Sequence, residues 1–248
     1  MDQRLMNAML EVDERHWWYR GRRLIVRTEL DRLPIATGAR ILDAGCGSGR
    51  MLEELAGYGT VSGIELDPDA AAFAASRGIG EVKVGRLEEL PWEEGTFELI
   101  TCLDVIEHTP DDRQTLAELR RVAKPGGWLL VSVPAYQALW SLHDVANHHY
   151  RRYSRRTLRL AAIAAGWRVR RMTSFNSILL APAAVVRYAQ RGRRPDDSYT
   201  PELKLGPEWL NALLERPLRA EASWLSRGGT LPAGLSLMAL LQNPGTED

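Results

Sequence analysis

The sequence predicts an α/β fold in which a mostly parallel sheet is covered by helices on both faces. Two observations lead to this prediction: short apolar runs alternate with stretches of helical periodicity, and an early apolar run passes directly into a glycine-rich turn at residues 45–49. Parallel strands need helical crossovers of this kind between them. With 248 residues, the chain is long enough to bury the core of such a sheet.

The expected elements follow one another in a regular order. The apolar runs are short and are bounded by glycine, proline or acidic residues, as strands commonly are. Strands are expected near residues 40–43, 61–65, 81–84, 97–103 and 128–133, and helices near 49–57, 68–77 and 112–123. A helix near 154–165 then leads to a strand near 167–174, and Leu235 to Gln242 is expected to close the sheet.

Four parts of the chain can be separated on this basis. Residues 1–36 form an N-terminal arm, 37–175 the core, 176–230 a helical insertion, and 231–248 the closing strand and tail. The arm combines a helix from Leu5 to Val12 with an aromatic and basic run. We expect it either to act as a lid or to be anchored to the core by its tryptophans. The insertion carries two apolar helical stretches, which predict a substrate cover or a dimer surface.

Composition narrows the class of protein. Thirty-two basic and thirty-two acidic residues balance, so no overall field attracts nucleic acid or an anionic membrane. Cys46 and Cys102 form neither a disulfide framework nor a zinc pattern, the N-terminus lacks an apolar signal core, and the apolar run at 178–186 is too short to span a bilayer. The composition therefore predicts a soluble, cytoplasmic protein.

The glycine-rich turn predicts a site for a nucleotide-like cofactor. Asp43 ends the apolar run before the turn, and Glu65 ends the next apolar run, twenty residues after Gly45. A carboxylate there can accept hydrogen bonds from both ribose hydroxyls. The dinucleotide pattern G-x-G-x-x-G nevertheless fails, because its third glycine is replaced by Arg50.

These residues resemble the signature of the class I S-adenosylmethionine (SAM)-dependent methyltransferases. The resemblance continues through residues 90–100, 104–108 and 124–127 and covers roughly residues 38–175. It implies a Rossmann-like, doubly wound sheet of seven strands whose last strand is antiparallel. It also implies SAM as cofactor and S-adenosyl-L-homocysteine as product.

The resemblance also assigns cofactor contacts. Asp43 and the turn glycines would serve the amino acid end, Glu65 the ribose and Leu66 the adenine. Where the family usually has Gly-Asp after the third strand, this chain has Gly85-Arg86, so the backbone amide of Leu87 is expected to substitute. The full expected set is Asp43, Gly45, Cys46, Gly47, Gly49, Glu65, Leu66, Arg86, Leu87, Asp104 and Arg23.

The segment after the fourth strand is similar to the Glu-x-x-Glu-His segment of ubiquinone-pathway O-methyltransferases. It reads Asp104-Val105-Ile106-Glu107-His108. In one interpretation Asp104 faces the cofactor and His108 forms a polar wall of the substrate pocket. In the other, Glu107 and His108 stabilise the loop and the helix that follows.

Residues 134–153 are rich in histidine and aromatic side chains. His143, oriented by Asp144, is a candidate general base that removes a proton from a hydroxyl acceptor. Alternatively, His143, Asp144 and His148 bind a divalent metal, although the metal-dependent members of the family use carboxylate-rich sets, so no metal is expected. A third interpretation is a polar loop whose aromatic side chains merely pack.

The sequence thus predicts a SAM-dependent methyltransferase that methylates an oxygen of a small, hydrophobic or aromatic acceptor. The expected substrate-binding residues are Trp17, Trp18, Tyr19, Tyr136, Trp140, Arg151 and Arg152. Alternatives are methylation of nitrogen or carbon, a lipid-linked or sugar acceptor, and a non-catalytic SAM-binding partner protein. Base-methylating enzymes carry an Asn/Asp-Pro-Pro-Tyr/Phe segment that is missing after the fourth strand, which argues against nucleic acid. Contact with a membrane surface and a homodimer stay open.

Overall fold

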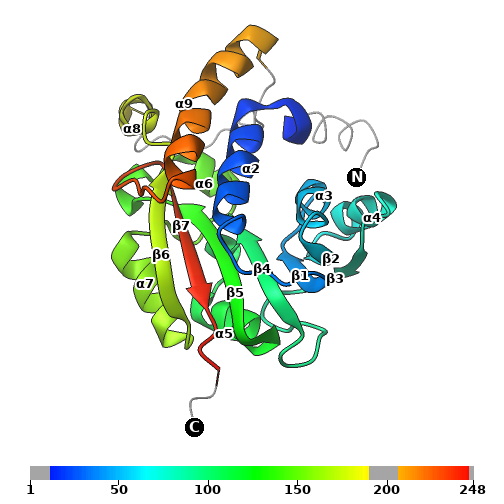
Figure 1. Cartoon of the computed structure of the whole chain (residues 1–248). Helices are drawn as coiled ribbons and strands as arrows, with labels where there is room; N and C mark the ends of the chain where they lie inside the picture. Colours follow the sequence, from blue (N-terminus) through cyan, green and yellow to red (C-terminus); the bar gives the residue numbers. More distant parts are fainter. Residues whose placement is uncertain (1–11, 190–205, 246–248) are drawn as a thin grey trace.

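The computed structural model describes residues 12–189 and 206–245, which form one seven-stranded sheet with helices on both faces (Figure 1). The strand order is β3-β2-β1-β4-β5-β7-β6. The strands are β1 (Ala39–Ala44), β2 (Gly59–Glu65), β3 (Glu81–Val84), β4 (Phe97–Leu103), β5 (Ala123–Pro134), β6 (Arg168–Phe175) and β7 (Ser236–Gln242). Strands β1 to β5 pair in parallel, whereas β7 runs antiparallel to both β5 and β6. The predicted fold class is confirmed.

The helices lie close to their predicted positions. They are α2 (Trp17–Leu30), α3 (Arg50–Leu55), α4 (Pro68–Ser76), α5 (Asp112–Val122), α6 (Leu142–Ala146), α7 (Arg155–Ala164), α8 (Leu180–Ala189) and α9 (Glu208–Ser226), with short 3-10 turns η1 (Ile106–His108) and η2 (Gln137–Leu139). Helix α3 is shorter than predicted and starts after Gly49, whose φ of 76° is left-handed. Strand β5 starts five residues earlier than predicted because Lys124 to Gly127 continue it through an irregular register with β4.

Two apolar layers lie on opposite faces of the sheet. On one face, α5 and α7 cover the strands with buried residues such as Leu119 and Leu158. On the other, α2 and α9 lie side by side across the strands, with α3 and α4 beside them near β1 and β2 (Figure 1). Helices α2 and α9 approach closely at Gly21, where an added Cβ would lie 2.2 Å from Leu218 Cδ1.

Helix α2 of the N-terminal arm and helix α9 of the insertion are therefore packed onto this face of the core. In the arm, residues 12–15 are helical. The expected helix from Leu5 to Val12 lies outside the described residues except for its last residue. Within the described ranges no helix has the length and apolarity needed to cross a membrane.

Candidate functional site

The glycine-rich turn lies at the carboxyl ends of the parallel strands, where ligands bind in open α/β sheets. Gly45, Gly47 and Gly49 all have positive φ, which glycine adopts without a Cβ penalty. A Cβ on Gly45 would lie 2.5 Å from Val105 Cγ2, so the turn packs tightly against the end of β4. At Gly47, in contrast, an added Cβ would meet no atom of the described residues within 4 Å, so this side of the turn is open to a ligand.

Backbone amides hold the carboxylate of Glu65 in place. Its Oε2 accepts a hydrogen bond of 2.8 Å from the amide of Gly47, and its Oε1 accepts bonds from the amides of Leu66 and Asp67 at 2.8 and 3.1 Å. These bonds fix the carboxylate at the end of β2 and beside the glycine turn. Such a preorganised acceptor fits the two hydroxyls of a ribose.

Asp43 lies beneath the turn and is 2% exposed. Its Oδ1 accepts a hydrogen bond of 2.6 Å from Thr101 Oγ1. Burial raises the pKa of Asp43 to about 6, against the opposing effects of the Thr101 hydrogen bond and the positive charge of Arg22. The carboxylate is therefore ionised at neutral pH and provides a buried negative charge under the site.

A cavity of about 360 Å³ opens beside the turn. It joins the ends of β1, β2, β3 and β4, and seven of the predicted site residues line it: Gly45, Glu65, Leu66, Arg86, Leu87, Asp104 and His108. The other predicted cofactor residues, Asp43, Cys46, Gly47, Gly49 and Arg23, do not line this cavity. Cys46 is buried against Gly63, and burial raises the pKa of its thiol, so it packs as an apolar side chain.

Side chains of the N-terminal arm close over the glycine turn. Asp13 accepts a hydrogen bond of 2.5 Å from Ser48 Oγ, and Arg23 donates to the carboxylate and the backbone oxygen of Asp13 at 3.2 and 2.8 Å. Arg23 therefore stabilises the arm instead of facing the cavity. Arg22 reaches the cavity in its place, because its Nη1 donates to Asp104 Oδ2 at 2.6 Å.

The arm's aromatic residues divide between anchoring and the site. Trp18 stacks on Phe175 with ring centroids 5.7 Å apart, and Trp17 packs edge-on against Trp18. These two rings anchor α2 to the sheet. Tyr19 lies at the site end of α2, where the guanidinium of Arg22 is 5.4 Å from its ring centroid and burial raises the pKa of its hydroxyl.

A buried ion pair organises the loop after β5. Asp144 Oδ1 accepts a hydrogen bond of 2.6 Å from Arg152 Nε and contacts His149 Nδ1 at 3.0 Å, while Oδ2 accepts from the amide and hydroxyl of Ser141. Burial alone would raise the pKa of Asp144, but the bonds from His149 and Arg152 hold it well below its usual range. Asp144 thus orients His149, and not His143 as the sequence interpretation had it.

The same ion pair corrects the expectation for Arg152. Its guanidinium is buried and also donates to the backbone oxygen of Ala135 at 3.1 Å, so it is committed to the loop rather than to a substrate. Arg151 donates to the backbone oxygen of Pro110 at the cavity rim. Tyr136 has a φ of 61° and packs against the core, and Trp140 is half-buried.

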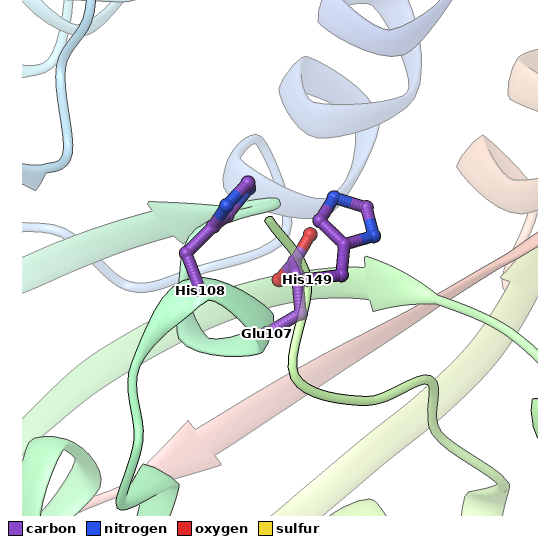
Figure 2. A group of neighbouring side chains, drawn as sticks. All are labelled: Glu107, His108 and His149. Carbon is purple, nitrogen blue, oxygen red and sulfur yellow. The ribbon is translucent and has the colours of Figure 1, made fainter. Parts of the chain in front are cut away.

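Glu107, His108 and His149 lie close together (Figure 2), and His108 also lines the cavity. One ligand atom from each lies within 4.8 Å of the others, and the rings of His108 and His149 are 4.6 Å apart. Burial and then the charge of Asp104 raise the pKa of Glu107, and burial and then His149 lower the pKa of His108 to about 4. One carboxylate and two imidazoles in this arrangement are a donor set that can hold a cation.

The two remaining candidate histidines lie further out. The ring of His143 is 6.3 Å from that of His149, and burial, followed by the charge of Arg187, lowers the pKa of His143 to about 4. His148 is exposed and has a φ of 55°. The sequence assigns no role to Asp13, gives Glu107 at most a role in stabilising its loop, and does not select one histidine among His143, His148 and His149. The Glu-His pair after β4 and the crowding of histidines after residue 142 are nevertheless visible signals.

Comparison with known proteins gives the chain its relatives. A family model described as a methyltransferase domain matches residues 17–171. A ubiquinone biosynthesis O-methyltransferase from Thiobacillus denitrificans is 36% identical over 108 residues, which are 41% of this chain and 46% of that protein. The corresponding protein from Xanthomonas oryzae pv. oryzae is 37% identical over 108 residues, or 45% of its length. The chain thus matches less than half the length of these curated relatives.

Solved structures share the fold along most of the chain. A chain of the complex between the Haloferax volcanii Trm112 methyltransferase activator and a methyltransferase has a TM-score of 0.63 at 19% identity, with 96% of this chain and 93% of that chain covered. An S-adenosylmethionine-dependent methyltransferase from Mesorhizobium loti has a TM-score of 0.58 at 16% identity, with 88% and 95% covered. At these identities the likeness concerns the fold.

Proposed function

Since this chain belongs to the methyltransferase-domain family and is a SAM-dependent methyltransferase, we propose that it methylates a hydroxyl oxygen of a small, hydrophobic or aromatic molecule. One observation carries the proposal. His108 lines the cofactor cavity and at the same time contacts the histidine-rich loop after β5. A polar group that can receive or hold an acceptor hydroxyl therefore lies directly beside the cofactor.

The residues present fit SAM. The open side of Gly47 accommodates a ligand against the main chain, Glu65 is preorganised for ribose hydroxyls, and Leu66 offers an exposed apolar surface to adenine. The carboxylates of Asp43 and Asp104 place negative charge near the amino acid end and the sulfonium. Arg86 at the cavity rim stands where the family usually has an acidic residue, so we assign the adenine contact to the backbone of Leu87.

When bound, SAM supplies a methyl group on a sulfonium: the acceptor oxygen bonds to this carbon as the carbon–sulfur bond breaks, and neutral S-adenosylhomocysteine is left. The chain's residues position the acceptor and exclude water. Asp13 and Arg22 hold the arm over the glycine turn and the cavity. Tyr136 and Trp140 stay the proposed apolar contacts for the acceptor. The hydroxyl proton leaves to solvent through the cavity, which His108 lines, whereas His143 does not reach it.

The relatives support oxygen as the methylated atom. The matched proteins are named ubiquinone biosynthesis O-methyltransferases, and the shared 108 residues amount to about two fifths of this chain. Their acceptor is not assigned to this chain, because the match covers less than half of those proteins and fold alone does not set the substrate.

A lipid-linked acceptor is the second candidate, and exposed apolar residues of the insertion favour it. Ile178, Val185 and Val186 in and before α8 are 61%, 70% and 55% exposed, and Trp209 at the start of α9 is 68% exposed. Such a surface fits the hydrocarbon part of an acceptor or of a bilayer interface.

A coupled assay for S-adenosylhomocysteine tests the proposal. Purified protein is incubated with SAM and, separately, with catechol, a monophenol, a prenylated phenol, an aromatic amine and short RNA. Turnover with the phenols supports oxygen methylation, and turnover restricted to the prenylated phenol favours the lipid-linked candidate. Turnover with the amine or RNA alone would contradict the proposal.

A further inference from the structure

Two distant segments bring a carboxylate and two imidazoles together beside the cofactor cavity. Glu107 and His108 lie on η1 directly after β4, whereas His149 comes from the loop that follows α6 (Figure 2). We propose that Glu107, His108 and His149 bind a divalent transition-metal ion such as Zn²⁺. The role of this site rests on the proposed function: the metal ion would bind the hydroxyl of the acceptor and position it for methylation.

The burial of the Glu107 carboxylate supports a metal ion at this site. The side chain of Glu107 is 1% exposed, and its Oε2 has no hydrogen-bond partner among residues 12–189 and 206–245. A buried carboxylate oxygen without a partner is expensive and is rarely kept without a reason. The backbone oxygen of Glu107 accepts a bond of 2.7 Å from the amide of Tyr150, so the two segments are fixed together at this point. A metal ion would satisfy the orphaned oxygen.

The orientation of the His149 ring also supports a metal ion at this site. Its Nδ1 is bonded to Asp144 Oδ1 at 3.0 Å, which leaves Nε2 as the ring nitrogen available to a ligand. Asp144 is in turn held by Arg152 and by Ser141. Histidine ligands of metals are typically oriented by a carboxylate in this way, which makes Asp144 a positioning residue.

The donor set selects the kind of ion. Two imidazoles with one carboxylate suit Zn²⁺ and similar transition metals, whereas Mg²⁺ and Ca²⁺ prefer oxygen donors. Ligand atoms around a tetrahedral Zn²⁺ are roughly 3.4 Å apart. The ligand atoms of Glu107, His108 and His149 lie within 4.8 Å of one another, so they would have to move closer together to bind the ion. His108, the most exposed of the three residues, can make this adjustment.

Three protein ligands leave a coordination position open, as in catalytic zinc sites. Because His108 also lines the cofactor cavity, this position adjoins the place where the methyl group is delivered. A hydroxyl bound to the ion would lose its proton more readily than a free hydroxyl. An acceptor with a second oxygen beside the hydroxyl, as in a catechol, would bind best.

The metal set considered from the sequence, His143, Asp144 and His148, does not form. The Asp144 carboxylate is occupied by Arg152, Ser141 and His149, and His148 is exposed. Across the part of the chain that the structure describes, Glu107, His108 and His149 make up the one group with metal-ligand geometry.

Titration of the full-length, chelator-treated protein with Co²⁺ tests the site, because the visible absorption of Co²⁺ reports its coordination and Zn²⁺ can then compete. We expect one equivalent of Co²⁺ to bind and Zn²⁺ to displace it. His149→Ala, His108→Ala and Glu107→Gln should each weaken binding at least tenfold, and Asp144→Asn about 10- to 100-fold through His149. His148→Ala, a change at the exposed neighbouring histidine, is the matched control and should bind as the wild type does.

The melting temperature of every variant, compared with that of the wild type, checks that the fold is intact. Absence of stoichiometric Co²⁺ binding in the wild type, or equal loss in His148→Ala, would overturn the metal site. The outcome is separable from the proposed function, since metal binding is measured without an acceptor. A metal-binding protein that methylates no hydroxyl contradicts only the proposed function, and phenol methylation by protein proven metal-free contradicts only the metal site.

Discussion

The Nη1 of Arg22 lies 2.6 Å from Oδ2 of Asp104, which joins helix α2 of the arm to the end of β4 across 82 residues of sequence. Asp104 has a φ of 60°, a left-handed conformation that a non-glycine residue seldom adopts. Such backbone conformations are kept where the surrounding structure determines them, and they are frequent at functional sites. The pair therefore couples the position of the arm to the cofactor cavity.

Arg22 is predicted to bind the carboxylate of the cofactor. Its Nε is buried without a partner among the described residues, so one donor is available after the bond to Asp104 is made. We expect Arg22→Gln to weaken binding of S-adenosylhomocysteine about tenfold or more, while binding of 5′-methylthioadenosine, which lacks the amino acid part, changes little. Calorimetry with both ligands measures the difference. Arg27→Gln, at an exposed position of the same helix, is the control, and equal losses for both ligands would refute the assignment.

Glu65 is predicted to bind the ribose hydroxyls. Glu65→Gln keeps the size of the side chain but removes its charge and one acceptor, and we expect SAM affinity to fall by about tenfold or more, as for the loss of charge-assisted hydrogen bonds. Glu94→Gln, at an exposed residue away from the cavity, should leave affinity unchanged. Calorimetric titration with SAM compares the two variants, and wild-type affinity in Glu65→Gln would remove Glu65 from the site.

Asp43 makes both cofactor binding and stability depend on pH. Its folded-state pKa of about 6 lies above the usual value of 3.8, so the folded protein holds this proton more tightly than the unfolded chain does. Its contribution to stability therefore decreases as pH rises from about 4 to 6 and is constant above that range. Because the ionised form puts a negative charge beneath the glycine turn, the affinity for the cationic SAM should rise over the same interval.

Asp43→Asn isolates this effect from the other carboxylates. The difference in free energy of unfolding between wild type and Asp43→Asn should change between pH 4 and 6 and stay flat from pH 7 to 8, as measured by urea unfolding. The pH dependence of SAM affinity below pH 6 should be weaker in the variant. A difference in stability that does not vary with pH would show that Asp43 does not titrate in this range.

Gly21 is predicted to be required for the close approach of α2 and α9. In Gly21→Ala the new Cβ would collide with Leu218, whose Cδ1 lies 2.2 Å from that position, and we expect a loss of about 1–3 kcal/mol in stability. Leu218→Ala alone creates a cavity and also destabilises. In the double variant the collision with Cδ1 and Cγ is gone and only Leu218 Cβ, 2.7 Å from the added Cβ, still has to shift, so urea unfolding should give a smaller loss than the sum of the two. If the two losses in stability simply added, the contact between residue 21 and Leu218 would not be the cause of the loss in Gly21→Ala.

The fold could be predicted from the sequence because its signals are local. The apolar runs that become β1, β2 and β4, and the acid–glycine turn after β1, are short contiguous patterns with a known structural meaning. The family resemblance added the antiparallel last strand, which local pattern alone does not specify. The extension of β5 through Pro125 and Gly126 was not foreseen, because both residues are ordinarily turn formers.

The positions of residues at strand ends could be predicted from the sequence, whereas contacts between distant side chains could not. Glu65 and Leu66 follow β2 directly, so their position at the cavity was readable from the sequence. The partner of Asp144 was not readable, because His143 and His149 are both near it in sequence and only the tertiary path of the loop selects His149. Likewise, it is the rotation of α2 about its axis that places Arg22, and not Arg23, beside Asp104.

The most direct test of the account is the fate of a ¹³C-labelled methyl group supplied on SAM to the protein with catechol as acceptor. The carbon chemical shift of the product separates a methoxy group from a methyl on nitrogen or carbon. We expect a methoxy product with the wild type. With Glu65→Gln at limiting SAM, the methoxy product should form at least tenfold more slowly. A labelled methyl found on carbon, or an unreacted catechol in the presence of bound SAM, would contradict oxygen methylation of such acceptors.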